Sequence, residues 1–123
     1  MSEASDWDDV RVLEIQLQRG QPLELTDVVI GLLRRAARQV ALTDAESTQG
    51  LCSPSDAATL VKEIRRRIRE GSRRLSRAIV EADRRKGVGD VQGARQIFVE
   101  LLSVEAVPLY RQTAQTQLEA LDD

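Results

Sequence analysis

Hydrophobic side chains recur every three to four residues along most of the chain, which is the spacing of α-helices rather than of β-strands. The first such segment covers residues 6–19, and acidic residues in its first turn suit the start of a helix. Gly20 follows as a natural stop. The apolar residues of this segment are Trp7, Val10, Leu13 and Leu17.

The second apolar segment covers residues 26–42, with Thr26 as a candidate N-cap. Its apolar side chains cover most sides of a helix rather than one stripe. A helix of this kind is usually central in a bundle or carries an interface. The pattern therefore predicts a central helix. The apolar positions are 28, 29, 30, 32, 33, 36, 37, 40 and 41.

A third, longer helix is predicted from Pro54 to about Arg85, with a length of about 45 Å. Before it, Thr43 and Glu46 could form a capping box for one short helical turn. Gly71 is followed by Ser72, and Gly/Ser pairs are common kink sites, so the long helix is either continuous or broken there. Its apolar stripe consists of Leu60, Ile64, Ile68, Leu75, Ile79 and Ala82.

The segment "KGVGDVQG" is predicted to be a turn, with Asp90 as the N-cap of the next helix. It nearly matches a dinucleotide-binding glycine pattern, but no strand precedes it and the third glycine is one position late. Pro108 predicts that this helix ends or bends near residues 104–107, and Tyr110 lies in a last helix that follows. The sequence thus predicts an all-α fold, a compact bundle of about five helices with a long basic third helix and a C-terminal antiparallel helical hairpin.

The length of 123 residues predicts a single helical domain over 1–123, with an ordered core over about 6–121. The only aromatic residues are Trp7, Phe98 and Tyr110, so the core must be mainly aliphatic. Cys52 is the single cysteine, which suits a reducing compartment, and we expect it to be an inert loop residue. No apolar run approaches a membrane span and the first residues are acidic, so we expect a soluble cytoplasmic protein without membrane contact.

The chain contains no histidine, which removes the commonest general base and the commonest metal ligand. Neither a Ser-His-Asp arrangement nor a Cys/His zinc site can be built. An enzyme that uses carboxylates, lysine or tyrosine remains open, but no pattern points to one. We therefore predict no catalytic, cofactor-binding or metal-binding residue, and no cofactor.

Basic side chains follow one face of the predicted long helix, at steps of four, three, four, four and seven residues. Residues 60–86 carry eleven basic and four acidic side chains, or +7, in a chain whose net charge is −2. These basic residues, called the arginine ridge below, are the candidate partner-binding residues. They are Lys62, Arg66, Arg69, Arg73, Arg77 and Arg84.

The arginine ridge has three interpretations. It can be a solvated helix face with local ion pairs, because Glu63–Arg67, Glu70–Arg74 and Glu81–Arg85 are spaced i,i+4. It can bind the acidic surface of a partner protein, since arginine pairs with carboxylates at interfaces. It can also bind nucleic acid, although the chain is acidic overall and no aromatic residue lies among the arginines to stack on bases.

The second predicted helix also offers a seam for self-association. Its apolar residues stand in near succession, and a small bundle cannot readily cover all of them. An aliphatic two-fold dimer is the simplest result, and a monomer in which other helices bury this surface is the alternative. The candidate seam residues are Val28, Val29, Ile30 and Leu33.

Several segments of the chain resemble the DUSAM domain family, a large set of small paralogous myxobacterial proteins of unknown function. The resemblance lies in "LELTDVVIGLLRRAA", "IRRRIREGSRRLSRAI", "GDVQGARQIF" and "VEAVPLYRQTAQTQLEAL", and it covers roughly Trp7 to Leu121. It implies a stand-alone intracellular protein of one domain and supplies no reaction. The cadence after Gly89 is also similar to a tetratricopeptide helix pair, which supports a C-terminal helical hairpin.

From these patterns we predict a non-enzymatic intracellular protein–protein interaction or adaptor module. The alternatives are a nucleic-acid-binding protein that uses the arginine-rich helix and an immunity-type protein that neutralises a cognate toxin. The sequence identifies no partner.

Overall fold

The computed structural model describes residues 3–122, and over this range its regular secondary structure consists of six α-helices and no strand. The predicted all-α class is thus confirmed. The helix beyond the expected five is α3, which forms where the sequence predicted one short turn. The helices are α1 (Glu3–Gln18), α2 (Asp27–Gln39), α3 (Asp44–Gly50), α4 (Pro54–Gly87), α5 (Val91–Val104) and α6 (Pro108–Ala120).

The chain divides into two compact units, Met1–Ile68 (unit 1) and Arg69–Asp123 (unit 2), where the sequence predicted one compact bundle. The reason lies in the lengths of the helices. The 34 residues of α4 extend over about 50 Å, whereas the 16 residues of α1 extend over about 24 Å. No single helix of the chain can cover α4 along its whole length, so α4 contributes its first part to unit 1 and its second part to unit 2.

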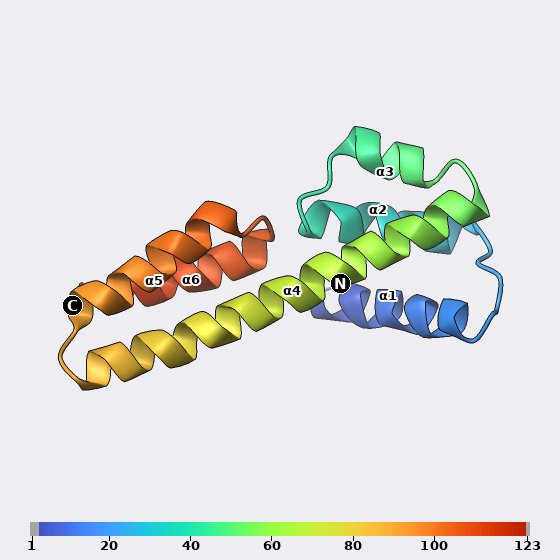
Figure 1. The fold of residues 1–123 in the computed structure, drawn as a ribbon. Coiled ribbons are helices and arrows are strands. Elements are labelled where there is room, and N and C mark those ends of the chain that lie inside the picture. Colours follow the sequence, from blue (N-terminus) through green and yellow to red (C-terminus); the bar gives the residue numbers. More distant parts are fainter. Residues whose placement is uncertain (1–2, 123) are drawn as a thin grey trace. The chain divides into compact units, whose positions relative to one another are not determined.

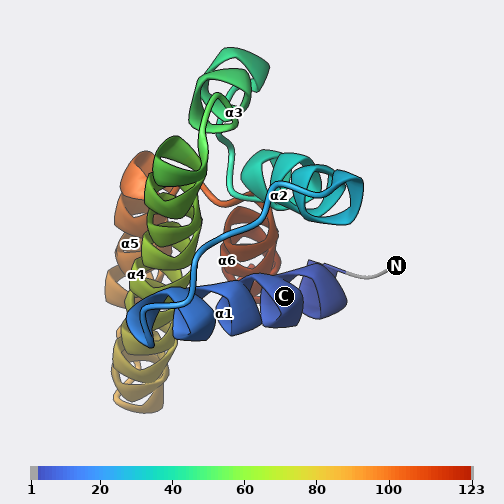
Figure 2. The ribbon, with the colours of Figure 1, turned by 90° about the vertical axis from the view of Figure 1, so that its right-hand side faces the viewer.

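In unit 1, α2 contacts both α1 and α3, as Figures 1 and 2 show from two sides. The central position predicted for this helix is therefore found within unit 1. Thr26 accepts a hydrogen bond from the N–H of Val29, as its N-cap assignment required. The largest completely buried apolar side chains of the unit are Val10, Leu33, Val40, Val61 and Ile64.

The predicted capping box is present at the start of α3. Thr43 Oγ1 accepts from the N–H of Glu46, and Glu46 Oε1 accepts from the N–H of Thr43. Ser53 caps α4 in a similar way, because its hydroxyl accepts from the N–H of Asp56. These caps set where α3 and α4 begin.

Helix α4 runs without a break through Gly71, so the Gly71–Ser72 pair does not end the helix (Figure 1). Gly71 is buried, and a Cβ atom at this position would lie about 2.5 Å from the ring of Tyr110. The glycine thus allows the first turn of α6 to approach the backbone of α4.

In unit 2, α5 and α6 form the predicted antiparallel hairpin (Figure 1). Asp90 caps α5 by accepting from the N–H of Gly93, and α6 begins with Pro108 at its first position. The hairpin packs on the second part of α4 around Phe98. The buried cluster consists of Leu75, Ala78, Ala82, Ala94, Phe98, Leu101 and Ala114.

Candidate functional site

All six residues of the arginine ridge are exposed on α4. Lys62 and Arg66 lie in the part of the helix that belongs to unit 1, and the other four lie in the part that belongs to unit 2. The apolar side chains of α4, such as Ile64 and Leu75, are buried. The helix therefore separates its basic and apolar faces, as the spacing predicted.

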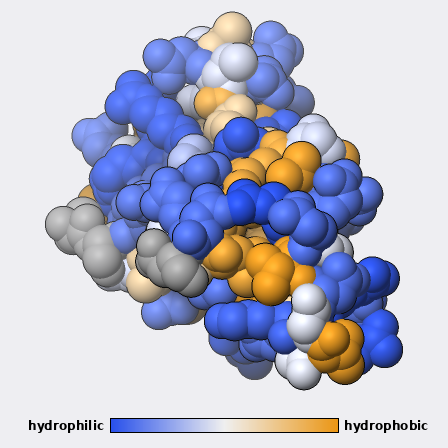
Figure 3. Space-filling model, turned by 90° about the vertical axis from the view of Figure 1, so that its left-hand side faces the viewer, coloured by the Kyte–Doolittle hydropathy of each residue, from blue (hydrophilic) through white to orange (hydrophobic). Residues whose placement is uncertain are grey.

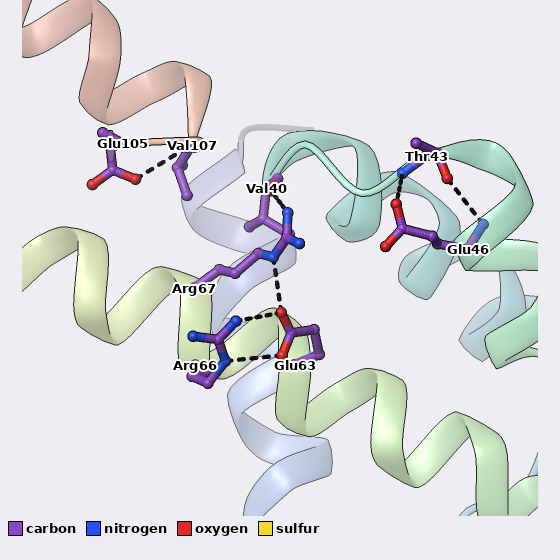
Figure 4. A network of polar contacts seen from close by, with 8 residues as sticks. All are labelled: Val40, Thr43, Glu46, Glu63, Arg66, Arg67, Glu105 and Val107. Atoms are coloured by element: carbon purple, nitrogen blue, oxygen red, sulfur yellow. Dashed lines mark hydrogen bonds and ion pairs between the residues drawn. The ribbon is translucent and has the colours of Figure 1, made fainter. Parts of the chain in front are cut away.

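Two further arginines of α4, Arg65 and Arg67, have structural roles in unit 1. Arg65 Nε lies 3.2 Å from Glu14 Oε1 on α1, and both side chains are largely buried. Arg67 donates to the carbonyl oxygen of Val40 at 3.0 Å, so it satisfies a carbonyl at the end of α2 (Figure 4). These two arginines hold α4 to its neighbours within unit 1.

Glu63 pairs with one arginine of the ridge, Arg66, and with the half-buried Arg67 of the same helix. Its carboxylate accepts from Arg66 at 2.6 and 2.9 Å and from Arg67 at 2.9 Å (Figure 4). The hydrogen bonds from Arg66, with a further contribution from Arg67, lower the pKa of Glu63 to about 2. The predicted Glu63–Arg67 pair is confirmed, and Arg66 of the ridge is neutralised by the same carboxylate.

Glu105 is the corresponding anchor in unit 2. Its side chain is almost completely buried, and Oε1 accepts from Arg74 at 2.9 Å. Its Oε2 accepts from the N–H of Val107 at 3.1 Å. Arg111 donates to the carbonyl oxygens of Leu102 and Glu105, which satisfies the end of α5. Arg74 therefore links α4 to the turn of the α5–α6 hairpin.

The ridge residues of unit 2 differ in how far their charges are balanced. Arg84 forms a two-pronged pair with Glu81, at 3.0 and 2.7 Å, and this contact lowers the pKa of Glu81. Glu81 also accepts from Arg85, which confirms the predicted i,i+4 pair. Arg73 and Arg77 make no hydrogen bond or ion pair with any of residues 3–122.

Two shallow depressions border these unpaired arginines. One has a volume of about 320 Å³ and is lined by Glu70, Arg73, Arg74 and Arg77. The other has a volume of about 450 Å³ and is lined by Ser76, Arg77, Val80 and Glu81. Arg77 lines both, and Val80 is 70% exposed. Val80 is one of several exposed aliphatic residues of the described range, and Figure 3 shows hydrophobic side chains among hydrophilic ones on one face of the molecule.

The candidate seam for self-association is corrected at one position. Leu33 is completely buried in unit 1 and is a core residue, because α2 places it toward its neighbouring helices. Val29 and Ile30 are half-buried, and Val28 is exposed over 80% of its surface. Self-association stays a prediction, restricted to these three residues.

The structural roles of two buried carboxylates, Asp6 and Glu105, were not predicted from the sequence. Asp6 was interpreted as a first-turn acid, but it is buried and accepts from Arg35 at 3.3 Å and from Gln39 at 2.9 Å. The hydrogen bond from Arg35, followed by that from Gln39, lowers the pKa of Asp6. A signal existed, since Asp6 has helical spacing to Val10 on the apolar face. Glu105 lies between two helices, where no periodicity marks an inward position.

Residues 3–122 contain no group of three or more Cys, Asp or Glu side chains that could hold a metal ion. Over the same range, none of the helices combines the length and the apolar character that crossing a bilayer requires. Cys52 is exposed, and its thiol donates weakly to the carbonyl oxygen of Thr48. The candidate functional site is the exposed face of α4 that carries the arginine ridge.

One family model, described as "Protein of unknown function (DUF2379)", matches residues 5–121. No curated protein and no solved structure matches the chain. The family match covers nearly the same range as the sequence resemblance to the DUSAM domain, and that name stays a prediction.

Proposed function

The chain belongs to DUF2379, a family of proteins of unknown function, and we propose that it is a non-enzymatic protein–protein interaction module that binds an acidic partner through the arginine ridge. We place this role in the cytoplasm, because a single cysteine without a partner thiol suits a reducing compartment. The proposal concerns binding and includes no reaction.

The observation that carries the proposal is the contrast among the arginines of α4. Arg65, Arg67 and Arg74 are held by groups inside the units, and Arg66 and Arg84 are balanced by carboxylates of the same helix. Arg73 and Arg77 are exposed and unbalanced within residues 3–122. Guanidinium groups pair with carboxylates through parallel hydrogen bonds, so an acidic protein surface is a fitting ligand for them.

A capture experiment tests the proposal. The immobilised wild type and the Arg66→Glu/Arg69→Glu/Arg73→Glu variant are exposed to lysate of the source cells, and the bound proteins are identified by mass spectrometry. We expect at least one acidic protein to be retained by the wild type and lost by the variant. An unchanged set of bound proteins would show that the arginine ridge does not bind the partner.

The matched control carries the same change in charge in unit 1. The variant Arg11→Glu/Arg19→Glu/Arg34→Glu alters three exposed arginines outside α4 and should retain the partner. Treatment with nuclease distinguishes the alternative. A capture that is lost after nuclease treatment, and that falls steeply with salt, would show that the ridge binds nucleic acid instead.

A further inference from the structure

The arginine ridge is not uniform. Its two unpaired arginines lie one helical turn apart in unit 2, and Lys62, which also has no partner among residues 3–122, lies in unit 1. Arg66 is balanced by Glu63 and Arg84 by Glu81, both within α4. Between them lie Arg73 and Arg77, which have no partner among residues 3–122. They are four residues apart, so their Cα atoms are separated by about 6 Å along the helix axis.

Val80 continues this row by a further three residues. It is 70% exposed and lines the same depression as Arg77. Because positions spaced three and four residues apart share a helix face, Arg73, Arg77 and Val80 form one continuous row. We call these three residues the docking strip. It offers two cations one turn apart, followed by an apolar side chain. Two depressions, with volumes of about 320 and 450 Å³, border it.

We propose that the docking strip binds an acidic amphipathic helix of another protein. The helix carries two carboxylates at i and i+4, which repeat the spacing of Arg73 and Arg77, and an aliphatic residue one turn further, which contacts Val80. The inference rests on the proposed function, which it deepens by naming the partner's chemistry. The charge complementarity selects the occupant, and the single exposed valine explains why an amphipathic helix fits better than a purely acidic chain.

The length of the strip argues against a nucleic acid as the occupant. Glu70 and Glu81 line the depressions at its two ends, which limits the free positive charge to about one turn. A duplex gains affinity by contacting several phosphates in succession, and an exposed valine adds nothing to such a contact. Two carboxylates on one helix face, by contrast, can both be paired by Arg73 and Arg77 alone.

The test uses a fluorescein-labelled alanine-based helical peptide of about 16 residues, with Glu at i and i+4 and Leu at i+7. Its isomer has the same composition but places the two glutamates on opposite faces of the helix. Fluorescence anisotropy with the full chain should show the patterned peptide binding about tenfold more tightly than the isomer, since only the former pairs with both arginines at once. Equal affinities would overturn the proposal, because they would indicate general attraction between opposite charges.

Matched variants locate the binding. Arg73→Ala/Arg77→Ala should weaken the patterned peptide about tenfold, whereas Arg66→Ala/Arg84→Ala, which removes the same charge from the paired residues, should change its affinity less than about twofold. Val80→Asp should abolish binding, and Val28→Asp, at a similarly exposed valine of unit 1, should not. Circular dichroism confirms that each variant is folded. Equal effects of the two arginine pairs would refute the strip.

Two other occupants are distinguished in the same assay. A labelled DNA duplex that binds more tightly than the peptide would overturn the proposal in favour of nucleic acid. A wild type that sediments as a dimer, and that Arg77→Ala makes monomeric, would replace the partner helix with a second copy of the chain. If the capture experiment finds a partner that depends on the ridge but not on Arg73→Ala/Arg77→Ala, the strip is wrong and the proposed function stands. If the patterned peptide binds specifically but no captured protein depends on the ridge, the strip stands and the proposed function fails.

Discussion

Each of the two units buries one carboxylate, and the two are held in different ways. In unit 1, Asp6 of α1 accepts hydrogen bonds from two side chains of α2, Arg35 and Gln39. In unit 2, Glu105 lies between α5 and α6 and accepts from Arg74 and from the backbone N–H of Val107. Asp6 thus ties two helices together by their side chains, whereas Glu105 also satisfies the backbone of a turn.

This difference determines what each carboxylate contributes. If Asp6 is lost, the partly exposed Arg35 can turn to water. If Glu105 is lost, the N–H of the buried Val107 loses the acceptor that the structure gives it. An unsatisfied buried donor costs its full desolvation energy, so the turn of unit 2 depends more on its carboxylate than the helix pair of unit 1.

The largest effect is therefore expected from Glu105→Ala. We predict that it lowers the free energy of unfolding by about 3 kcal/mol, against about 2 kcal/mol for Asp6→Ala, because it leaves the buried N–H of Val107 unsatisfied. Urea denaturation followed by circular dichroism measures both. The exposed Glu100→Ala, on α5, is the control and should cost less than about 0.5 kcal/mol. A larger loss for Asp6→Ala than for Glu105→Ala would reverse the comparison.

Gly71→Ala should be the next largest, with a loss of about 1–2 kcal/mol in spite of the gain in helix propensity. The new Cβ would lie about 2.5 Å from the ring of Tyr110 and 3.0 Å from Glu105 Oε1, so the ring of Tyr110 or the start of α6 must shift. The matched control is Gly87→Ala in the same helix, where a Cβ meets no atom within 4 Å, and it should not destabilise the chain.

A double-mutant cycle with Tyr110→Ala identifies the cause of this loss. If the ring of Tyr110 is the obstacle, Gly71→Ala should be nearly neutral once the ring is removed. A loss of the same size in both backgrounds would assign the effect to the backbone of α4 instead.

Much of the fold could be predicted because local signals decide it. The capping box of Thr43 and Glu46, the stop before Pro108 and the buried stripe of α4 are all consequences of residues close in sequence. The exposure of the ridge could be predicted for the same reason. The close approach of Tyr110 to Gly71 could not, because the two residues are 39 positions apart in the sequence.

The roles of Asp6 and Glu105 could not be predicted, because the partners of these carboxylates are far away in the sequence. That Arg74 binds Glu105, 31 positions away, depends on where the α5–α6 turn lies. Arg66 and Arg84 each pair with the glutamate three residues earlier, which leaves Arg73 and Arg77 as the arginines of the ridge without a partner among residues 3–122. The spacing of residues along α4 allowed these pairs without selecting among them.

Acid should weaken unit 1 through Asp6 and Glu63. The folded-state pKa of each is below its ordinary value, so the stabilisation is complete above about pH 4.5 and is lost as the pH falls through the folded pKa, which for Glu63 is about 2. We expect the free energy of unfolding to drop between about pH 5 and pH 2, and Asp6→Asn and Glu63→Gln each to remove about 1 kcal/mol of that drop. Denaturation curves over this range measure it. An unchanged pH dependence in the double variant would show that these carboxylates do not couple folding to pH.

The smallest predicted effect compares the helix ends of the two units. Helices α2 and α4 end in the same Schellman motif, in which the residue after the C-cap is in the left-handed region and two N–H groups bond back to the last turn. In unit 2 this residue is Gly89, with φ 84°, whereas in unit 1 it is Ala41, with φ 66°.

Alanine at such a position costs about 1–2 kcal/mol relative to glycine in the folded chain, and glycine loses about 0.5–1 kcal/mol more in backbone entropy on folding. Ala41→Gly should therefore stabilise the chain by about 0.5 kcal/mol, and Gly89→Ala should destabilise it by a similar amount, both measured by urea denaturation. The N–H of Leu42 bonds to Ala37 and that of Asp90 to Arg85, so the two motifs are matched in their hydrogen bonds and differ in the side chain at one position. If Ala41→Gly destabilised the chain, the methyl group of Ala41 would have to contribute packing that outweighs its strained backbone.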